Sequence, residues 1–374
     1  MPNLHELLKE MVEKGASDLH ITTNAAPTIR VHGRMVPLGE ALLTPSDTKQ
    51  MAYSILTDAQ KKKFEEDREL DLSFGVRGLS RFRANVYLQR GAVAVAIRTI
   101  PHRIFSFDEL GLPKVVAELC EKPKGLILVT GPTGSGKSTT LATMVDKINA
   151  ERQEHIVTIE DPIEFVHLHK RCLVNQRELN SDTMSFAAAL KHVLRQDPDK
   201  VLVGEMRDLE TIQAALTIAE TGHLAFATLH TNSAAETINR IIDVFPSHQQ
   251  SQVRAQLAFV LEGVVTQTLL QKASGKGRVM ACEIMVCTPA IRALIRDDKV
   301  HQIYSAMQAG KKHGMQTLAD DLYKLYMGRE IKLEEALRVA PDQNEFLRMV
   351  GEPAGDDNAP PGKPGQKPAA PARR

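Results

Sequence analysis

The sequence contains no tryptophan, and aromatic residues make up only 4% of its 374 positions. Proteins that bind single-stranded nucleic acid commonly stack bases on aromatic side chains, so this scarcity argues against that class. The 47 lysines and arginines are balanced by 46 aspartates and glutamates, which gives a formal net charge of +1. Such a balance provides no general attraction for a polyanion. The composition is that of an ordinary folded protein.

Cysteine is also scarce, and no two of the four cysteines form a C-x-x-C pair. This spacing indicates neither a zinc site nor a disulfide framework, so we expect four small buried apolar side chains. No uninterrupted apolar run reaches the length of a membrane-spanning helix, and the first residues lack the basic and apolar regions of a signal peptide. We therefore expect a cytosolic protein without a membrane anchor of its own.

A glycine-rich stretch, GPTGSGKST at residues 131–139, follows an apolar run and precedes a helical pattern. This strand, turn and helix form the context that a P-loop requires, whereas a chance glycine-rich turn would lack it. The glycines let backbone N–H groups point at a phosphate chain, and the helix adds the positive end of its dipole. Lys137 is expected to reach the β- and γ-phosphates of ATP, and the Ser138 hydroxyl to ligate Mg²⁺. The predicted nucleotide-binding residues here are Thr133, Gly134, Ser135, Gly136, Lys137, Ser138 and Thr139.

The first hundred residues predict a smaller α+β domain without a catalytic motif. Its periodic segments are a helix at 4–12, strands at 18–22 and 28–32, a helical stretch at 44–69, and an antiparallel meander at 69–76, 79–89 and 92–99. Residues 101–113 contain two prolines and one glycine without a clear period. This segment is predicted to be an interdomain linker or hinge.

From residue 114 to about residue 350, short apolar strands alternate with helices, which predicts a second, α/β domain with a mostly parallel sheet. The strand patterns lie at 126–130, 155–159, 201–203 and 223–229. Beyond residue 233 we expect helices apart from one strand at 279–286, including a continuous helix over 253–270. The tail at 351–374 is rich in Pro, Gly, Ala and Lys, so we expect it to be disordered.

Acidic residues follow two of these strands, at the edge where ligands of a parallel sheet bind. Glu160 and Glu164 come after the second strand, and Glu205 after the third. One carboxylate there can hold Mg²⁺, commonly through water, while another orients the attacking water or takes its proton. We expect all three glutamates to be catalytic and Glu205 to be at the metal as well. The alternative is that they are solvated loop acids or helix caps.

Two histidines, His223 and His230, flank the fourth strand. Their separation of seven residues is odd, so on a continuous strand they face opposite sides and cannot share one metal ion. His230, at the carboxyl end, is the better candidate for sensing the γ-phosphate and is assigned to the catalytic set. His223 is assigned to the nucleotide-binding set. The alternative is a pair of hydrogen-bonded structural histidines.

Four segments occur in one order along the chain: the P-loop, TIEDPIE at 158–164, the stretch from RQDPD to GEMRD at 195–208, and the stretch from TGH to TLHTN at 221–232. Together they resemble the Walker A, Asp, Walker B and His boxes of the secretion ATPase superfamily, which drives type II secretion and type IV pili. SDLH at 17–20 and RVHG at 30–33 resemble its amino-terminal domain. The resemblance covers residues 3 to 345.

The segment AIRALIR at 290–296 is similar to the carboxy-terminal signature of pilus retraction motors, the PilT family. The tetracysteine zinc motif typical of pilus extension and type II secretion ATPases is absent, as is their extra amino-terminal region. Both points favour retraction. We keep three alternatives: an extension or secretion ATPase, a nucleic-acid translocase built on the same core, and a scaffold that binds ATP without turning it over.

The resemblance implies a homohexameric ring of RecA-like P-loop NTPase domains with smaller PAS-like amino-terminal domains. ATP and Mg²⁺ would lie between domains that move as rigid bodies about residues 101–113. Hydrolysis would power pilus retraction and twitching motility at the inner face of the cytoplasmic membrane. The implied partners are an inner-membrane platform protein and, as a further candidate, the extension ATPase, with no nucleic acid.

Phosphoryl transfer needs cations that offset charge on the phosphate oxygens, and arginines supplied across a moving interface can couple closure to chemistry. Each candidate has an ordinary surface salt bridge as its alternative. The arginines assigned to the nucleotide-binding set are Arg81, Arg83, Arg195, Arg207 and Arg240.

Overall fold

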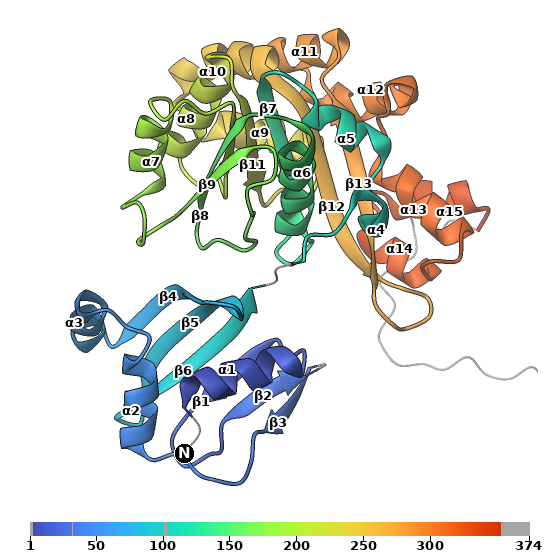
Figure 1. Cartoon of the computed structure of the whole chain (residues 1–374). Coiled ribbons are helices and arrows are strands. Elements are labelled where there is room, and N and C mark those ends of the chain that lie inside the picture. Colours follow the sequence, from blue (N-terminus) through green and yellow to red (C-terminus); the bar gives the residue numbers. More distant parts are fainter. Residues whose placement is uncertain (1–2, 32, 101–102, 353–374) are drawn as a thin grey trace, which may run out of the picture.

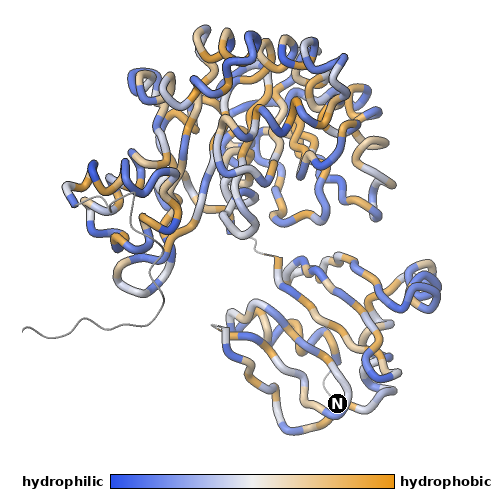
Figure 2. The backbone as a smooth tube through the Cα atoms, turned by 180° about the vertical axis from the view of Figure 1, so that it is seen from behind, coloured by the Kyte–Doolittle hydropathy of each residue, from blue (hydrophilic) through white to orange (hydrophobic). Residues whose placement is uncertain are grey.

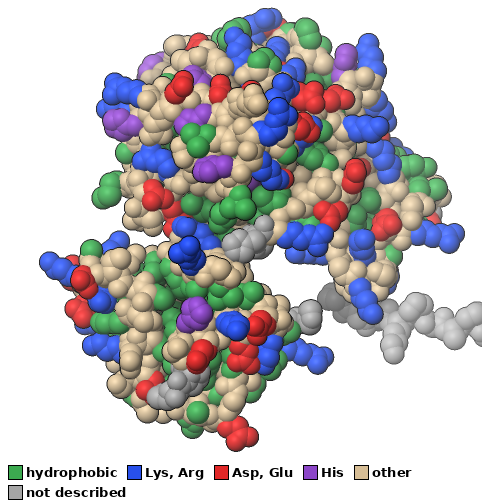
Figure 3. Space-filling view, in the orientation of Figure 1, with side chains coloured by type: hydrophobic (Ala, Val, Ile, Leu, Met, Phe, Trp, Pro, Cys, Tyr) green, Lys and Arg blue, Asp and Glu red, His purple; other side chains and the backbone are tan. Residues whose placement is uncertain are grey.

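The computed structural model describes residues 3–31, 33–100 and 103–352. Figure 1 shows a smaller body, residues 3–100, beside a larger body, residues 103–352. In the space-filling view of Figure 3 the two bodies meet over a narrow neck. The expected tail at 351–374 lies almost entirely outside the described residues, as do residues 101–102 of the expected linker. The domain boundaries therefore stay a prediction.

The smaller body is an antiparallel sheet of six strands in the order β3-β2-β1-β6-β5-β4. Its elements are α1 (Leu4–Glu13), β1 (Asp18–Ile21), β2 (Thr28–Val31), β3 (Arg34–Pro37), α2 (Pro45–Tyr53), α3 (Asp58–Asp67), β4 (Glu69–Val76), β5 (Ser80–Gln89) and β6 (Ala92–Ile100). The last three strands form the expected meander. The helical stretch at 44–69 divides into two helices because Thr57 begins a second one with its own capping box.

The larger body contains a seven-stranded sheet in the order β13-β12-β7-β11-β10-β8-β9, parallel except for β13. Its strands are β7 (Gly125–Thr130), β8 (His155–Glu160), β9 (Leu173–Glu178), β10 (Lys200–Val203), β11 (Leu224–Leu229), β12 (Leu261–Gln271) and β13 (Arg278–Val286). Its α-helices are α4 (Phe107–Leu110), α5 (Lys114–Cys120), α6 (Lys137–Glu151), α7 (Phe186–Val193), α8 (Leu209–Glu220), α9 (Ala234–Asp243), α10 (Ser247–Val260), α11 (Pro289–Arg296), α12 (Ile303–Ala309), α13 (Leu318–Met327), α14 (Leu333–Val339) and α15 (Gln343–Val350).

Helices cover both faces of the larger sheet because its central strands are apolar on both sides. Leu126 and Leu128 of β7 pack with α7 to α11, while Ile127 and Val129 pack with α5 and α6. The hydrophobic strands appear orange in Figure 2, in contrast to the hydrophilic helix α3 of the smaller body. All four cysteines are free and buried, as expected. No helix within the described residues has the length and apolar character needed to cross a membrane.

The continuous helix expected over 253–270 is wrong. The chain is helical in α10, becomes extended at Leu261, and continues as strand β12 between β7 and β13. A run of apolar residues fits helical and strand periods alike, so pairing with β7 decides the outcome. Gly263 of β12 allows close packing here, because a Cβ atom would lie 2.8 Å from a methyl of Leu119. The short strand β9 was also not expected.

The two arginines of α11 differ in their surroundings although they are one helical turn apart. The guanidinium of Arg292 donates to the carbonyls of Ala258 and Phe259 at 2.7 and 2.8 Å, and to Glu262 at 2.6 Å. It thereby satisfies carbonyls in the last turn of α10 that have no partner within that helix. Arg296 is mostly exposed and pairs with its neighbour Asp297. Arg292 therefore joins α10 to α11.

Arg292→Ala is expected to lower stability by about 2 kcal/mol, because it removes charge-assisted hydrogen bonds and leaves backbone carbonyls unpaired. Arg296→Ala is the matched control, with an expected change within about 0.5 kcal/mol. Thermal unfolding of both variants beside the wild type measures the difference. Equal midpoints for the two variants would contradict this assignment.

Candidate nucleotide site

The P-loop connects β7 to α6 at the carboxyl edge of the larger sheet (Figure 1). Gly131, Gly134 and Gly136 all have positive φ, and Gly136 is the residue from which α6 begins. At Gly131 a Cβ atom would lie 2.2 Å from the backbone oxygen of Gln267, so no other residue fits. The loop is thus pressed against β12, and Gln267 also donates its side-chain amide to the Ser135 carbonyl at 2.7 Å.

A cavity of about 640 Å³ opens over this loop. Most of the predicted site residues line it, although they come from five separate segments and from both bodies. The predicted residues at the cavity are Arg83, Thr133, Gly134, Gly136, Lys137, Ser138, Thr139, Glu160, Glu164, Glu205, Arg207 and His230. Ser135, Arg81, Arg195, Arg240 and His223 do not line it.

Lys137 lies folded back over the P-loop. Its ammonium donates to the carbonyls of Gly131 at 2.8 Å and Pro132 at 3.2 Å, and the side chain is buried. Burial lowers the pKa of Lys137, although the carboxylates of Glu205 and Glu164 oppose that shift. The cation is therefore held at the mouth of the loop, where a phosphate chain would lie.

Glu205, directly after β10, is linked to both sides of the cavity. Its carboxylate accepts from Arg207 Nη2 at 2.7 Å and lies 3.2 Å from His230 Nε2. The other ring nitrogen of His230 lies 3.5 Å from the Thr133 hydroxyl of the P-loop. Burial raises the pKa of Glu205, but Arg207 and His230 outweigh it, so that the pKa is lowered overall. Glu205 is thus ionised at neutral pH.

Glu160 at the end of β8 has the opposite electrostatic setting. Its carboxylate accepts from the Thr158 hydroxyl at 2.6 Å, from the Gln176 amide at 3.1 Å and from the backbone N–H of Glu164 at 3.4 Å. Burial nevertheless raises its pKa above the ordinary 4.5. Two carboxyl groups on one sheet edge therefore differ in proton affinity because their surroundings differ.

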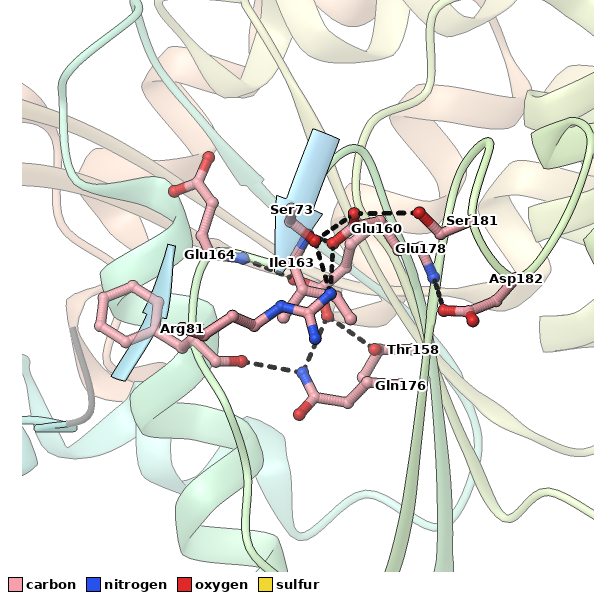
Figure 4. A network of polar contacts seen from close by, with 11 residues as sticks. Ser73, Arg81, Thr158, Glu160, Ile163, Glu164, Gln176, Glu178, Ser181 and Asp182 are labelled. Carbon is pink, nitrogen blue, oxygen red and sulfur yellow. Dashed lines mark hydrogen bonds and ion pairs between the residues drawn. The ribbon is translucent and has the colours of Figure 1, made fainter. Parts of the chain in front are cut away.

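The two arginines of β5 point to different places, although both belong to the smaller body. Arg83 lines the cavity and lies 3.9 Å from Asp71 on β4. Arg81 instead binds Glu178 of β9 at 2.9 Å and the Ser73 hydroxyl at 2.6 Å, as Figure 4 shows. Period-two spacing predicted that the two arginines share a strand face, but it did not predict that only Arg83 reaches the cavity.

Three further predicted residues lie away from the cavity of their own chain. Arg195 and Arg240 are exposed on the surface. His223 precedes β11 at the opposite edge of the sheet from the P-loop, with its ring 3.1 Å from the Thr221 hydroxyl and 3.2 Å from the Ile218 carbonyl. The structure does not bring these three residues to the P-loop.

Several cavity residues were missed from the sequence. Leu269 comes from β12, on the segment taken for a helix, and Arg278 begins β13, one residue before the strand expected at 279–286. Phe165 and His167 come from the loop between β8 and β9. Burial lowers the pKa of His167 to about 4, so this ring is neutral at physiological pH. None of these residues belongs to a recognisable motif, and only the pairing of β12 and β9 into the sheet places them.

Comparison with known proteins identifies the family of this chain. Residues 1–338 match the family described as Type II/IV secretion system protein. The chain is 53% identical over 316 residues to the "Type IV pilus retractation ATPase PilT" of Pseudomonas aeruginosa, which covers 84% of this chain and 92% of that protein. It is 40% identical over 345 residues to the "Type IV pilus ATPase PilU" of the same organism, which covers 92% and 90%.

Solved structures show the same fold. The crystal structure of the pilus retraction motor PilT, which holds bound ADP, matches with a TM-score of 0.88 and 52% identity over 93% of this chain and all of that chain. The ATPase DotB of Legionella pneumophila matches with a TM-score of 0.79 and 26% identity over 90% and 94%. The expected α/β fold and the resemblance to pilus retraction ATPases are confirmed, and the chain belongs to the type II/IV secretion system protein family.

Proposed function

We propose that this chain is a Mg²⁺-dependent ATPase that works as a homohexameric motor and powers retraction of type IV pili and twitching motility. The observation that carries the proposal is the convergence of the P-loop, Glu205 and His230 on one cavity. Binding alone would need only the P-loop, whereas hydrolysis also needs an ionised carboxylate beside the γ-phosphate. The pilus is proposed from the names of the relatives described above.

The cavity residues fit a nucleotide with Mg²⁺. Ser138 and Glu205 offer the hard oxygen ligands that this ion prefers. The described residues contain no cluster of three or more His, Cys, Asp or Glu that could hold a metal ion alone, so phosphate oxygens would complete the coordination. Mg²⁺, when bound, would offset charge on the β- and γ-phosphates. The P-loop N–H groups and Lys137 would hold the phosphate chain.

Glu205, Glu160 and Glu164 would have different roles in hydrolysis because their electrostatic surroundings differ. Glu205 stays ionised beside His230 and Thr133, so it is suited to orient the attacking water. Glu160 has the higher affinity for a proton and lies on the same edge of the sheet. Glu164 lines the cavity next to it. His230 would connect Glu205 to the P-loop and thereby to the γ-phosphate.

We propose domains at residues 1–100 and 114–350, a hinge at 101–113 and a tail at 351–374. In a ring, the nucleotide would lie between neighbouring domains. Arg195, Arg240 and His223 do not reach the cavity of their own chain, so we propose that they act across an interface between subunits. An inner-membrane platform protein, and the extension ATPase as a further candidate, would bind the ring at the cytoplasmic face of the membrane.

Steady-state phosphate release tests the enzyme. Lys137→Ala and Glu205→Ala are each expected to lower Mg²⁺-dependent kcat by at least about 100-fold, because each removes a charge aimed at the reacting phosphate. Lys147→Ala, on the same helix but paired with Glu151, is the matched control and is expected to keep wild-type turnover. Oligomer mass is recorded for each protein. A well-folded wild-type ring without turnover would contradict the proposal.

The pilus assignment is tested in cells. Expression of the chain in a Pseudomonas strain that lacks its own retraction ATPase is expected to restore twitching zones, and the Lys137→Ala variant is expected to leave them absent. Pilus retraction is observed directly by fluorescence microscopy of labelled pili. Restored pilus extension without retraction in a strain that lacks the extension ATPase would overturn retraction in favour of extension.

Glu160 and Glu205 are expected to make pH-dependent contributions of opposite sign to the stability of the fold. The pKa of Glu160 is raised, so its carboxylate destabilises the fold at neutral pH and this penalty fades as pH falls toward 4.5. Glu160→Gln is therefore expected to raise the unfolding midpoint at neutral pH while lowering kcat about 100-fold.

Glu205 has a lowered pKa, so its stabilising contribution is present above pH 4.5 and lost as pH falls through the lowered pKa. Glu205→Gln is expected to lower the unfolding midpoint at neutral pH, which makes it the matched opposite of Glu160→Gln. Thermal unfolding of nucleotide-free protein across this pH range measures both. A shift of the same sign in the two variants would contradict the electrostatic assignment.

A further inference from the structure

One buried carboxylate, Glu178 at the end of β9, connects the two bodies. Its side chain is only 3% exposed. Arg81 of β5 donates to it at 2.9 Å, and the Ser73 hydroxyl of β4 donates to its other oxygen. Figure 4 shows Arg81 and Ser73 approaching Glu178 from the smaller body. The smaller body thus provides the cation that compensates a charge buried in the larger one.

The same carboxylate also holds the loop that follows Glu160. The backbone N–H of Ile163 donates to the oxygen that Arg81 binds, at 3.1 Å. Ile163 is the immediate neighbour of Glu164, which lines the nucleotide cavity. One side chain therefore contacts both the smaller body and the acidic loop of the site.

A second residue of β9 fixes the rest of this loop. The amide of Gln176 donates to Glu160 at 3.1 Å and to the Phe165 carbonyl at 2.8 Å, and its oxygen accepts from the His167 N–H at 2.7 Å. Gln176 and Glu178 are two residues apart and lie on one face of the strand. The loop is therefore pinned at residues 163, 165 and 167, with the cavity residues Glu160 and Glu164 near its start.

We propose that Glu178 is a positioning residue, through which docking of the smaller body by Arg81 and Ser73 sets the placement of Glu160 and Glu164. The proposal rests on the ATPase function proposed above. A buried carboxylate that loses its cation is strongly destabilised, so Glu178 must move or find water when Arg81 leaves. Ile163 would lose its acceptor in the same event, and the glutamates would lose their fixed position. Arg81 then acts through Glu178 rather than on the nucleotide of its own chain.

A local contrast argues against an incidental ion pair. Arg98 of the neighbouring strand β6 donates to Asp18 at 2.8 Å, but its side chain is mostly exposed and both partners belong to the smaller body. Arg81 is largely buried and reaches a partner 97 residues away in the other body. Arg98→Ala is therefore a matched control for Arg81→Ala.

Steady-state kinetics test the positioning role. Glu178→Gln and Arg81→Ala are each expected to lower kcat about 10- to 100-fold with a KM change under about 3-fold, because a misplaced catalytic group impairs the reaction more than binding. The kcat of the double variant is expected to be no lower than that of the less active single variant. Arg81→Lys is expected to restore part of the activity, and Arg98→Ala to keep all of it. Wild-type kcat in Glu178→Gln, or multiplicative losses in the double variant, would overturn the proposal.

Hydrogen exchange in nucleotide-free protein gives a readout that does not depend on turnover. Arg81→Ala is expected to raise exchange in residues 161–168 of the larger body, and Arg98→Ala to leave it unchanged. Unfolding midpoints and oligomer mass confirm that each variant is folded. Unchanged exchange in Arg81→Ala would overturn the coupling. Absent turnover in the wild type would instead contradict the ATPase function, and the exchange comparison would still decide whether the smaller body holds the loop.

Discussion

The site depends on the parallel pairing of β8, β10, β11 and β7. In this register Ile159 pairs with Val203, Val203 with Ala227, and Leu229 with Thr130, so the strands end close to one line. The residues at the end of each strand or directly after it therefore lie at the same edge of the sheet. These are Glu160, Glu205, His230 and the P-loop. Side chains from different segments of the site would not meet without this register, because the segments are far apart in the sequence.

Much of the site could be predicted from the sequence, because it is formed by the residues that end or follow short apolar strands. The central strands are buried on both faces and are almost wholly apolar, so their positions along the chain and their ends are visible in the pattern. The contribution of β12 could not be predicted, since its apolar run also fits a helix. This error concealed Leu269 at the cavity and the contact of Gln267 with Gly131.

The edge strand β9 was hidden for a different physical reason. Its sequence, LVNQRE, is short, four of its six residues are polar, and it lacks the apolar alternation that indicates a strand. The polar residues are there because their partners are polar: Gln176 faces Glu160 and loop backbone, and Glu178 faces Arg81 and Ser73. Ser73 is 105 residues away from Glu178, so no local pattern could reveal the pair.

The placement of charge along β9 explains how the smaller body contributes to the structure of the larger body. Gln176, which forms hydrogen bonds with residues of the larger body, is neutral and can satisfy these partners without a counter-ion. Glu178 is charged, and its only cation within hydrogen-bond distance among the described residues is Arg81 of the smaller body. When the smaller body moves away, the Glu178 carboxylate at the base of the acidic loop loses this cation. Glu178 therefore links the acidic loop beside the candidate nucleotide site electrostatically to the smaller body. A motion between the two bodies would change the interactions that hold Glu160 and Glu164 in place.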